Sequence, residues 1–195
     1  KRECILFLDE FDVIAKLRDD KNELGELKRV VNSLIQNIDS FSENSILIAA
    51  TNHEELLDPA IWRRFTNVLT LEKPQKEEID QLLHVILDGK STNFLFTPKK
   101  MEHLQNALLG LSHSDINTIL LNALRNVVLS SRDCLTNCDV LKEIYLHKNH
   151  SICKEDSLIK YFMDNGATHK EINESMQIPL RKIQGISKAI DRKEM

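Results

Sequence analysis

Hydrophobic residues in the first 50 positions form two short unbroken runs with an amphipathic stretch between them. The runs are residues 4–8 and 46–50, and polar residues interrupt neither of them. Strands that helices cover on both faces of a parallel sheet have this pattern. Between the runs, apolar residues recur at helical spacing: Leu24, Leu27, Val30, Val31, Leu34, Ile35 and Ile38. The order strand, helix, strand predicts a parallel crossover unit.

A third strand is predicted at residues 67–71, and the pattern becomes helical after Pro74. Because Ser, Thr and Pro favour helix starts, four helices are expected: from about Lys76 to Asp88, after Thr97-Pro98, from near Ser114 and from near Thr136. Three short helices are expected beyond residue 157. We therefore predict an α/β fold with part of a parallel-sheet core (residues 1–74), a helical subdomain (75–154) and a small three-helix module (155–195).

Composition excludes several classes of protein. The 195 residues are 42% hydrophobic and 29% charged, which is too apolar for a disordered chain. No uncharged apolar run approaches the roughly 18 residues that cross a bilayer, and the first residues do not show the basic-then-apolar pattern expected of a leader peptide. Four unevenly spaced cysteines predict free thiols and a cytoplasmic location. Because Lys1 stands just before a buried-strand pattern, we expect a fragment of a longer protein.

Two adjacent carboxylates, Asp9 and Glu10, follow the first strand. Open α/β sheets bind ligands at the carboxyl ends of their strands. One carboxylate there can hold Mg²⁺ on phosphates, and the other can activate a water molecule. The alternative from these residues alone is a strand end followed by a solvated turn.

The second strand ends in Ala-Thr-Asn at residues 50–52, and Asp-Pro-Ala-Ile-Trp-Arg-Arg-Phe follows at 58–65. With the first strand and its Asp-Glu, this order resembles the second half of an AAA ATPase module over residues 4–120. The resemblance implies an ATP hydrolase that binds Mg²⁺ through Asp9 and uses Glu10 as the catalytic base. It also implies that Asn52 orients the attacking water.

The same resemblance implies that Arg63 and Arg64 are arginine fingers, which act on the ATP of a neighbouring subunit. We therefore expect a homo-oligomeric ring, by resemblance a hexamer, that remodels a protein or nucleic-acid complex. The two arginines are adjacent, whereas many family members separate them by Pro-Gly, so either could reach the phosphate. Residues 19–23 would line a central pore, although a surface turn fits them equally.

Ser112, His113 and Ser114 resemble the segment that opens a helix beside the adenine in this family, with His113 in place of a glycine. The alternative is a helix cap at Ser114 with an exposed histidine. The phosphate loop Gly-x-x-x-x-Gly-Lys-Ser/Thr is missing. Gly89-Lys90-Ser91 lacks its first glycine and follows a helix, so we interpret Gly89 as a left-handed helix end. The chain alone is not expected to bind ATP normally.

The segment after residue 155 resembles the helix-turn-helix of bacterial regulators and sigma factors. Thr168 would cap its second helix, and Pro179 would open its third. Four residues would then face DNA: Arg181, Lys182, Gln184 and Lys188. Gln177 stands where such motifs favour glycine, and the excess of basic residues is slight. The alternative function is therefore a DNA- or protein-binding regulatory module on a nucleotide-free ATPase fold.

Overall fold

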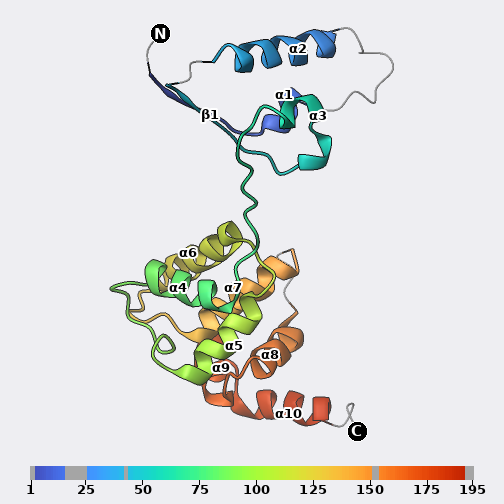
Figure 1. Ribbon diagram of the computed structural model, residues 1–195. Helices are drawn as coiled ribbons and strands as arrows, with labels where there is room; N and C mark the ends of the chain where they lie inside the picture. Colours follow the sequence, from blue (N-terminus) through green and yellow to red (C-terminus); the bar gives the residue numbers. More distant parts are fainter. Residues whose placement is uncertain (1–2, 16–25, 42–43, 151–153, 192–195) are drawn as a thin grey trace. The chain divides into compact units, whose positions relative to one another are not determined.

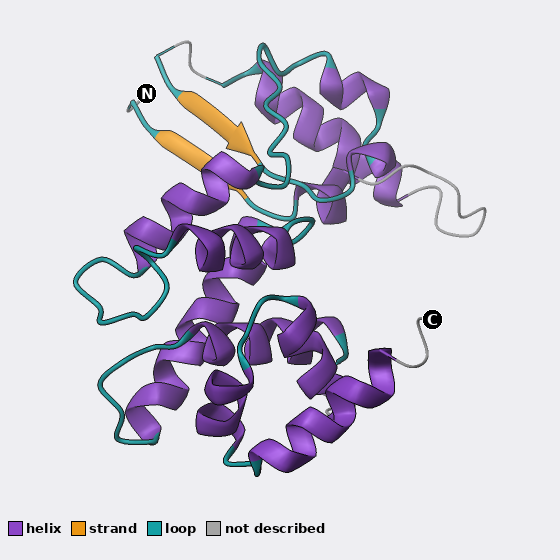
Figure 2. Cartoon of the chain, turned by 90° about the horizontal axis from the view of Figure 1, so that it is seen from below, coloured by secondary structure: helices purple, strands orange, loops and turns teal. Residues whose placement is uncertain are grey.

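The computed structural model describes residues 3–15, 26–41, 44–150 and 154–191, which form two compact units, 1–70 and 71–195 (Figure 1). The first unit contains the α/β elements. They are β1 (Ile5–Leu8), α1 (Phe11–Ala15), α2 (Glu26–Asp39), β2 (Ile46–Ala49), the 3₁₀ turn η1 (Glu54–Leu56) and α3 (Pro59–Trp62). The two strands pair in parallel, as the sequence predicts, with Ile5 opposite Ile46 and Leu8 opposite Ala49 (Figure 2).

Apolar side chains on one side of this small sheet make the core of the first unit. Phe11, Val31, Leu57 and Ile61 are buried, and Leu8, Ala49 and the α2 side chains Leu34, Ile35 and Ile38 pack against them. Phe65 meets the Phe11 ring edge-on at a centroid distance of 5.7 Å. The amphipathic stripe predicted for α2 is therefore confirmed for its second half, while Val30 is exposed.

Two expectations about the sheet are wrong for the described residues. Helices do not cover both faces: Ile5 and Phe7 are 70% and 57% exposed, because no described segment packs on their face. The predicted strand at residues 67–71 is not a strand, since it finds no partner in the described ranges. Leu69 and Leu71 are accordingly almost fully exposed.

The second unit is helical throughout. Its helices are α4 (Lys76–Ile86), α5 (Pro98–Leu108), α6 (His113–Leu129), α7 (Asn137–Lys148), α8 (Glu155–Asp164), α9 (His169–Met176) and α10 (Leu180–Asp191). Thr136 and Thr168 cap α7 and α9 as predicted, each accepting a hydrogen bond from the backbone N–H three residues on. Gly89 lies just past α4 with φ +67°, which confirms its left-handed conformation.

One hydrophobic cluster runs through all seven of these helices. Leu83 of α4, Leu120 of α6, Phe162 of α8 and Ile183 of α10 all belong to it and are fully or almost fully buried. The predicted helical subdomain (75–154) and the predicted three-helix module (155–195) therefore share a core. No described helix is long and apolar enough to cross a membrane.

One ion pair and one close steric contact also join α5 to the α8–α9 segment. Lys100 of α5 forms an ion pair with Glu171 of α9. The His103 ring lies so close to Gly166, between α8 and α9, that a Cβ at residue 166 would collide with it. Gly166 also has φ +77°, so both its backbone conformation and its neighbour require a glycine.

Candidate functional site

The carboxyl ends of β1 and β2 lie side by side. The Ala50 N–H donates to the Leu8 carbonyl at 2.9 Å, and the Phe11 N–H donates to the Ala50 carbonyl at 2.9 Å. These bonds continue the strand pairing beyond Leu8 and Ala49. The residues that follow the two strands, including Asp9, Glu10 and Asn52, therefore stand at the same edge of the sheet.

Asp9 and Glu10 form a tight, exposed turn at this edge. The Glu10 N–H donates to Asp9 Oδ1 at 2.9 Å, and Glu10 has a φ of 49°. A left-handed conformation is unfavourable for a residue with a side chain, and at functional sites such strain costs about 1–3 kcal/mol. The Glu10 carboxylate makes no hydrogen bond to any residue that the structure describes. It is therefore available to a ligand or to water.

A hydrogen bond between Asp12 and Thr51 joins the segments that follow β1 and β2, next to Glu10 and Asn52. Thr51 Oγ1 donates to Asp12 Oδ1 at 2.7 Å and accepts from the His53 N–H at 3.0 Å. Asn52, between the two residues that make these bonds, has an exposed side chain. Sequence reasoning missed this support, although Asp12 lies only two residues after Glu10.

The donor set at this edge fits Mg²⁺. Magnesium is commonly bound by one or two carboxylates together with substrate phosphates and water. Asp9 is exposed, and only one of its oxygens accepts the Glu10 N–H, so the other remains for a cation. The described residues hold no group of three His, Cys, Asp or Glu side chains that would by itself enclose a metal.

The two adjacent arginines have different surroundings. Asp58 caps α3 by accepting the Ala60 N–H at 2.8 Å, and Arg63 and Arg64 follow where this short helix ends. Arg64 donates from Nε and Nη2 to the two carboxylate oxygens of Asp39, at 2.8 and 3.0 Å. Arg63 is exposed and has no ion pair or hydrogen bond from its side chain within the described ranges.

Comparison with known proteins assigns these strand-end residues to a family. Residues 1–73 match the ATPase family associated with various cellular activities, known as AAA. Residues 1–73 belong to the AAA ATPase family. The AAA segment thus contains Asp9, Glu10, Asn52 and both arginines.

Relatives extend the similarity beyond the AAA segment. An uncharacterized AAA family ATPase of Sinorhizobium fredii is 40% identical over 132 residues, which are 68% of this chain and 38% of that protein. A putative 26S proteasome regulatory subunit homolog of Methanocaldococcus jannaschii is 31% identical over 140 residues, or 70% and 37%. The ATP-dependent zinc metalloprotease FtsH 2 of Bdellovibrio bacteriovorus is 31% identical over 124 residues, or 60% and 20%. The chain spans less than half the length of these relatives.

Outside the AAA segment, the start of α6 differs from the predicted cap. Ser112, not Ser114, caps this helix, because its hydroxyl accepts the Asp115 N–H at 3.1 Å. Asp115 Oδ2 in turn accepts from the Ser112 N–H and hydroxyl, and these bonds lower the pKa of the Asp115 carboxyl. His113 and Ser114 are exposed as the first residues of α6. Any contact of this segment with adenine is an expectation from the AAA resemblance.

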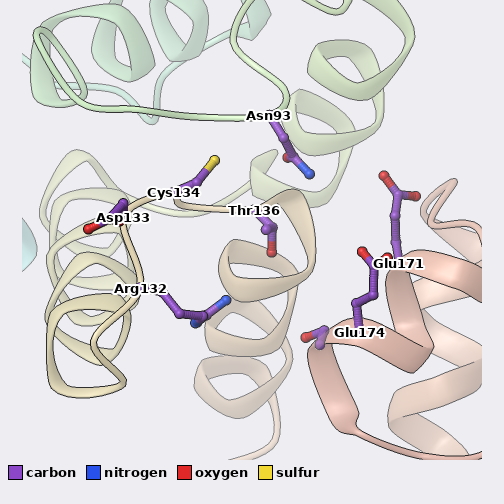
Figure 3. Close-up of a pocket in the computed structure, with 8 residues that line it drawn as sticks. Asn93, Arg132, Asp133, Cys134, Thr136, Glu171 and Glu174 are labelled. Atoms are coloured by element: carbon purple, nitrogen blue, oxygen red, sulfur yellow. The ribbon is translucent and has the colours of Figure 1, made fainter.

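A pocket of about 350 Å³ opens in the helical unit, away from the AAA motifs in sequence (Figure 3). It is lined by Asn93, Arg132, Asp133, Cys134, Thr136, Glu171, Glu174 and Ser175. Much of its charge is already paired: Arg132 forms a bidentate pair with Asp139, and Glu171 is bound to Lys100. The pocket thus offers few free polar groups to a ligand.

The candidate DNA-facing residues all lie on α10. Arg181, Gln184 and Lys188 are exposed, whereas the Lys182 ammonium is held by Glu155 of α8. Gln177, just before α10, has φ 54° and ψ 35°, so it adopts the left-handed turn conformation that glycine favours at this position. The residues predicted at the strand ends and those on α10 therefore belong to different units.

Proposed function

We propose that this chain is the Walker B to C-terminal portion of an AAA ATPase that hydrolyses Mg-ATP in a homo-oligomeric ring, by resemblance a hexamer. Turnover would drive the remodelling of a protein or nucleic-acid complex. One observation carries the proposal: the Glu10 carboxylate, unpaired among the described residues, stands in a left-handed turn beside Asp9 at the end of a parallel strand. The AAA match over residues 1–73 supports it.

The strand-end residues would have different roles in hydrolysis. Asp9 would hold Mg²⁺, which neutralises charge on the β- and γ-phosphates when it is bound. Glu10, which has no competing hydrogen bond to the part of the chain that the structure describes, accepts the proton of the attacking water. Asn52 supplies a neutral amide that holds this water and the γ-phosphate in line, while the Asp12–Thr51 bond fixes the backbone on which Asn52 stands.

Of the two arginines, Arg63 fits the role of a finger and Arg64 a supporting role. An arginine finger needs a guanidinium that can extend across the subunit interface and stabilise transition-state charge on the neighbouring subunit's nucleotide. Arg63 is exposed and unpaired in the described part of the chain, whereas Asp39 and the Ala60 carbonyl hold Arg64 in place. Arg63 therefore acts in trans, across a head-to-tail interface between subunits.

The first test changes the proposed base. In the full-length protein, Glu10→Gln should leave Mg-ATP binding intact and reduce turnover at least 100-fold, because the amide cannot accept the proton. Glu54→Gln makes the same chemical change on an exposed residue of η1 and should keep the parental rate. Parental turnover in Glu10→Gln would refute the assignment of the base.

The second test addresses the shared site. Arg63→Ala should also abolish most turnover, and mixing it with Glu10→Gln should restore part of the activity. In mixed rings, some interfaces combine an intact Glu10 from one subunit with an intact Arg63 from the next. Mixed rings that assemble but stay inactive would exclude a shared site.

A result without any nucleotide binding would favour the other function. If the full-length protein neither binds nor hydrolyses ATP, the chain is a DNA- or protein-binding regulatory module on a nucleotide-free ATPase fold. Calorimetric titration with Mg-ATP separates the two functions directly.

A further inference from the structure

Between residues 181 and 188, one exposed face of α10 carries polar and basic residues and no acid, and the acidic residue Asp191 ends the helix. Arg181, Gln184, Gly185 and Lys188 occupy positions i, i+3, i+4 and i+7, so they lie on one side of the helix. All four are exposed, while Ile183, on the opposite side, is fully buried. The face therefore belongs to a helix that the core of the second unit holds in a fixed orientation.

The charge on this face is not neutralised by any side chain that the structure describes. Three acids on α8 and α9 pair with other lysines: Glu155 with Lys182, Glu171 with Lys100 and Glu174 with Lys170. The hydrogen bond to Glu155 raises the pKa of Lys182, and the nearby Asp156 of α8 raises the pKa of that lysine further. Arg181 and Lys188 have no acidic partner in the described ranges. Lys188 stands seven positions after Arg181, which is about 10 Å along the helix at the usual rise per residue. Their spacing is close to the width of the DNA major groove, about 12 Å.

Gly185 has no structural reason to be a glycine. It lies inside α10, where glycine is less favourable than alanine. A Cβ built on Gly185 would meet no atom within 4 Å, and its φ is not in the left-handed region. Neither packing nor backbone conformation therefore requires it. What Gly185 does provide is bare backbone between Arg181, Gln184 and Lys188, where another molecule can approach closely.

The turn before α10 is short, and local hydrogen bonds fix it. Three residues, 177–179, join α9 to α10, which is the spacing of a helix-turn-helix. Gln177 makes the left-handed turn, and the Asn173 side chain donates to the Ile178 carbonyl at 2.6 Å. The turn is thus fixed by local bonds, and α10 is the second helix of the pair.

We propose that this face of α10 binds duplex DNA in the major groove, with Arg181 and Lys188 on phosphates and Gln184 toward the base edges. Gly185 lets the helix approach the DNA closely. Lys182 takes no part, because Glu155 holds it. The proposal does not depend on ATP hydrolysis, since it concerns another unit and other residues.

Two free cations predict weak, salt-dependent binding. Neutralising two phosphates gives a slope of about −1.8 in a plot of log K against log salt. Binding without sequence selection typically has a Kd of about 10⁻⁴–10⁻⁶ M. The 195-residue chain should therefore bind a fluorescent 20-base-pair duplex in this range at about 50 mM salt, measured by anisotropy.

Charge reversal tests the face against a matched control. The double variant Arg181→Glu, Lys188→Glu should bind the duplex at least tenfold more weakly. The control Arg125→Glu, Lys90→Glu changes the same residue types on exposed sites of α6 and the loop after α4, and its affinity should change less than twofold. Equal losses in both double variants would mean that net charge alone attracts DNA, and the proposed face would be wrong.

Gly185 supplies a readout that a purely structural role would not give. Gly185→Ala should raise the melting temperature, because alanine favours the helix, and yet weaken duplex binding. Gly185→Leu should weaken it further. A lower melting temperature in Gly185→Ala, or unchanged affinity in both variants, would contradict the close approach. If polyglutamate competes as well as duplex DNA does, the partner is an acidic protein surface instead and the proposal fails.

Discussion

Arg64 and Asp39 form a bidentate ion pair that joins the end of α3 to the end of α2. Arg64 Nε and Nη2 lie 2.8 and 3.0 Å from the two Asp39 oxygens, and Arg64 Nη1 donates to the Ala60 carbonyl at 2.5 Å. Hydrogen bonds from Arg64 lower the pKa of the Asp39 carboxyl, and the same bonds raise the pKa of Arg64. Arg63, its neighbour in sequence, has no such partner among the described residues.

This difference predicts that the two arginines can be separated by measuring stability. In the 195-residue chain, Arg64→Ala should lower the melting temperature of the first unit, because α3 loses its tie to α2. Asp39→Ala should reproduce the effect, and Arg63→Ala should leave the melting temperature unchanged. Differential scanning calorimetry makes the measurement. Equal destabilisation by Arg63→Ala would show that Arg63, too, has a structural role.

A second prediction concerns the strained turn at Gln177. Its φ of 54° is unfavourable for a residue with a Cβ. Gln177→Gly should therefore raise the free energy of unfolding by about 0.5–1 kcal/mol. Chemical denaturation of the chain gives this number.

The control for this prediction is Gly89→Ala. Gly89 also has a left-handed φ, of 67°, and no neighbour that a Cβ would touch. Alanine at residue 89 should destabilise the chain by about 1 kcal/mol, since the strain is then added rather than removed. If Gln177→Gly is neutral or destabilising, the Gln177 side chain makes a favourable contribution that outweighs its backbone strain.

The sequence predicted the helices and strands better than it predicted the contacts those elements make. Strand and helix periods identify β1, β2 and the helices of the second unit, because burial imposes those periods. Residues 67–71 have the apolar pattern of a strand, yet a strand also needs a partner, which a local pattern does not encode. Ser112 displaced Ser114 as the cap of α6 because Asp115 completes a reciprocal pair of bonds with it.

In the candidate site, too, local features could be predicted from the sequence and tertiary contacts could not. Asp9, Glu10 and Asn52 could be found because they directly follow strand patterns. The Arg64–Asp39 pair could not, since the two residues lie 25 positions apart and nothing in the sequence marks Asp39. The conformation of Glu10 was also beyond the sequence, because a positive φ in a residue other than glycine arises from bonds that tertiary structure imposes.

A third prediction follows from the ion pair between Lys100 and Glu171. Burial raises the pKa of the Glu171 carboxyl, but hydrogen bonds from Lys100 and Thr168 outweigh burial, so the pKa of Glu171 lies below its ordinary value. The native state thus binds fewer protons than the unfolded state. The stability from this pair is present above the unfolded pKa and is lost as the pH falls through the folded pKa.

The Lys100→Met variant isolates this contribution. It should be less stable than the parent at pH 7, and the difference should shrink as the pH is lowered to 3, because the Glu171 carboxylate takes up protons as the pH falls through its folded pKa. Urea titrations at the two pH values measure it. Lys170→Met removes a more exposed lysine, which pairs with Glu174 at 3.8 Å, and should have little effect at either pH.

A fourth prediction concerns the buried hydroxyl of Tyr161. Its Oη is buried without a hydrogen-bond partner among the described residues, and burial raises the pKa of Tyr161 to about 12. A buried polar group without a partner costs about 1–3 kcal/mol. Tyr161→Phe should therefore stabilise the chain by about 1 kcal/mol. Chemical denaturation tests this, with Tyr145→Phe on the neighbouring ring, 5.4 Å away, as the control.

The core shared by α4–α10 limits how the tail can be handled. Phe162 of α8, Ile172 of α9 and Ile183 of α10 are fully buried in the same cluster as the side chains of α4–α7. Truncation before α8 would uncover the inner faces of α5 and α7, and α8–α10 grafted onto another protein would expose theirs. The second unit should therefore be expressed or fused to another protein only as a whole. Because the helices share this core, any rotation of α4–α7 would move the basic face of α10 with it as one rigid body.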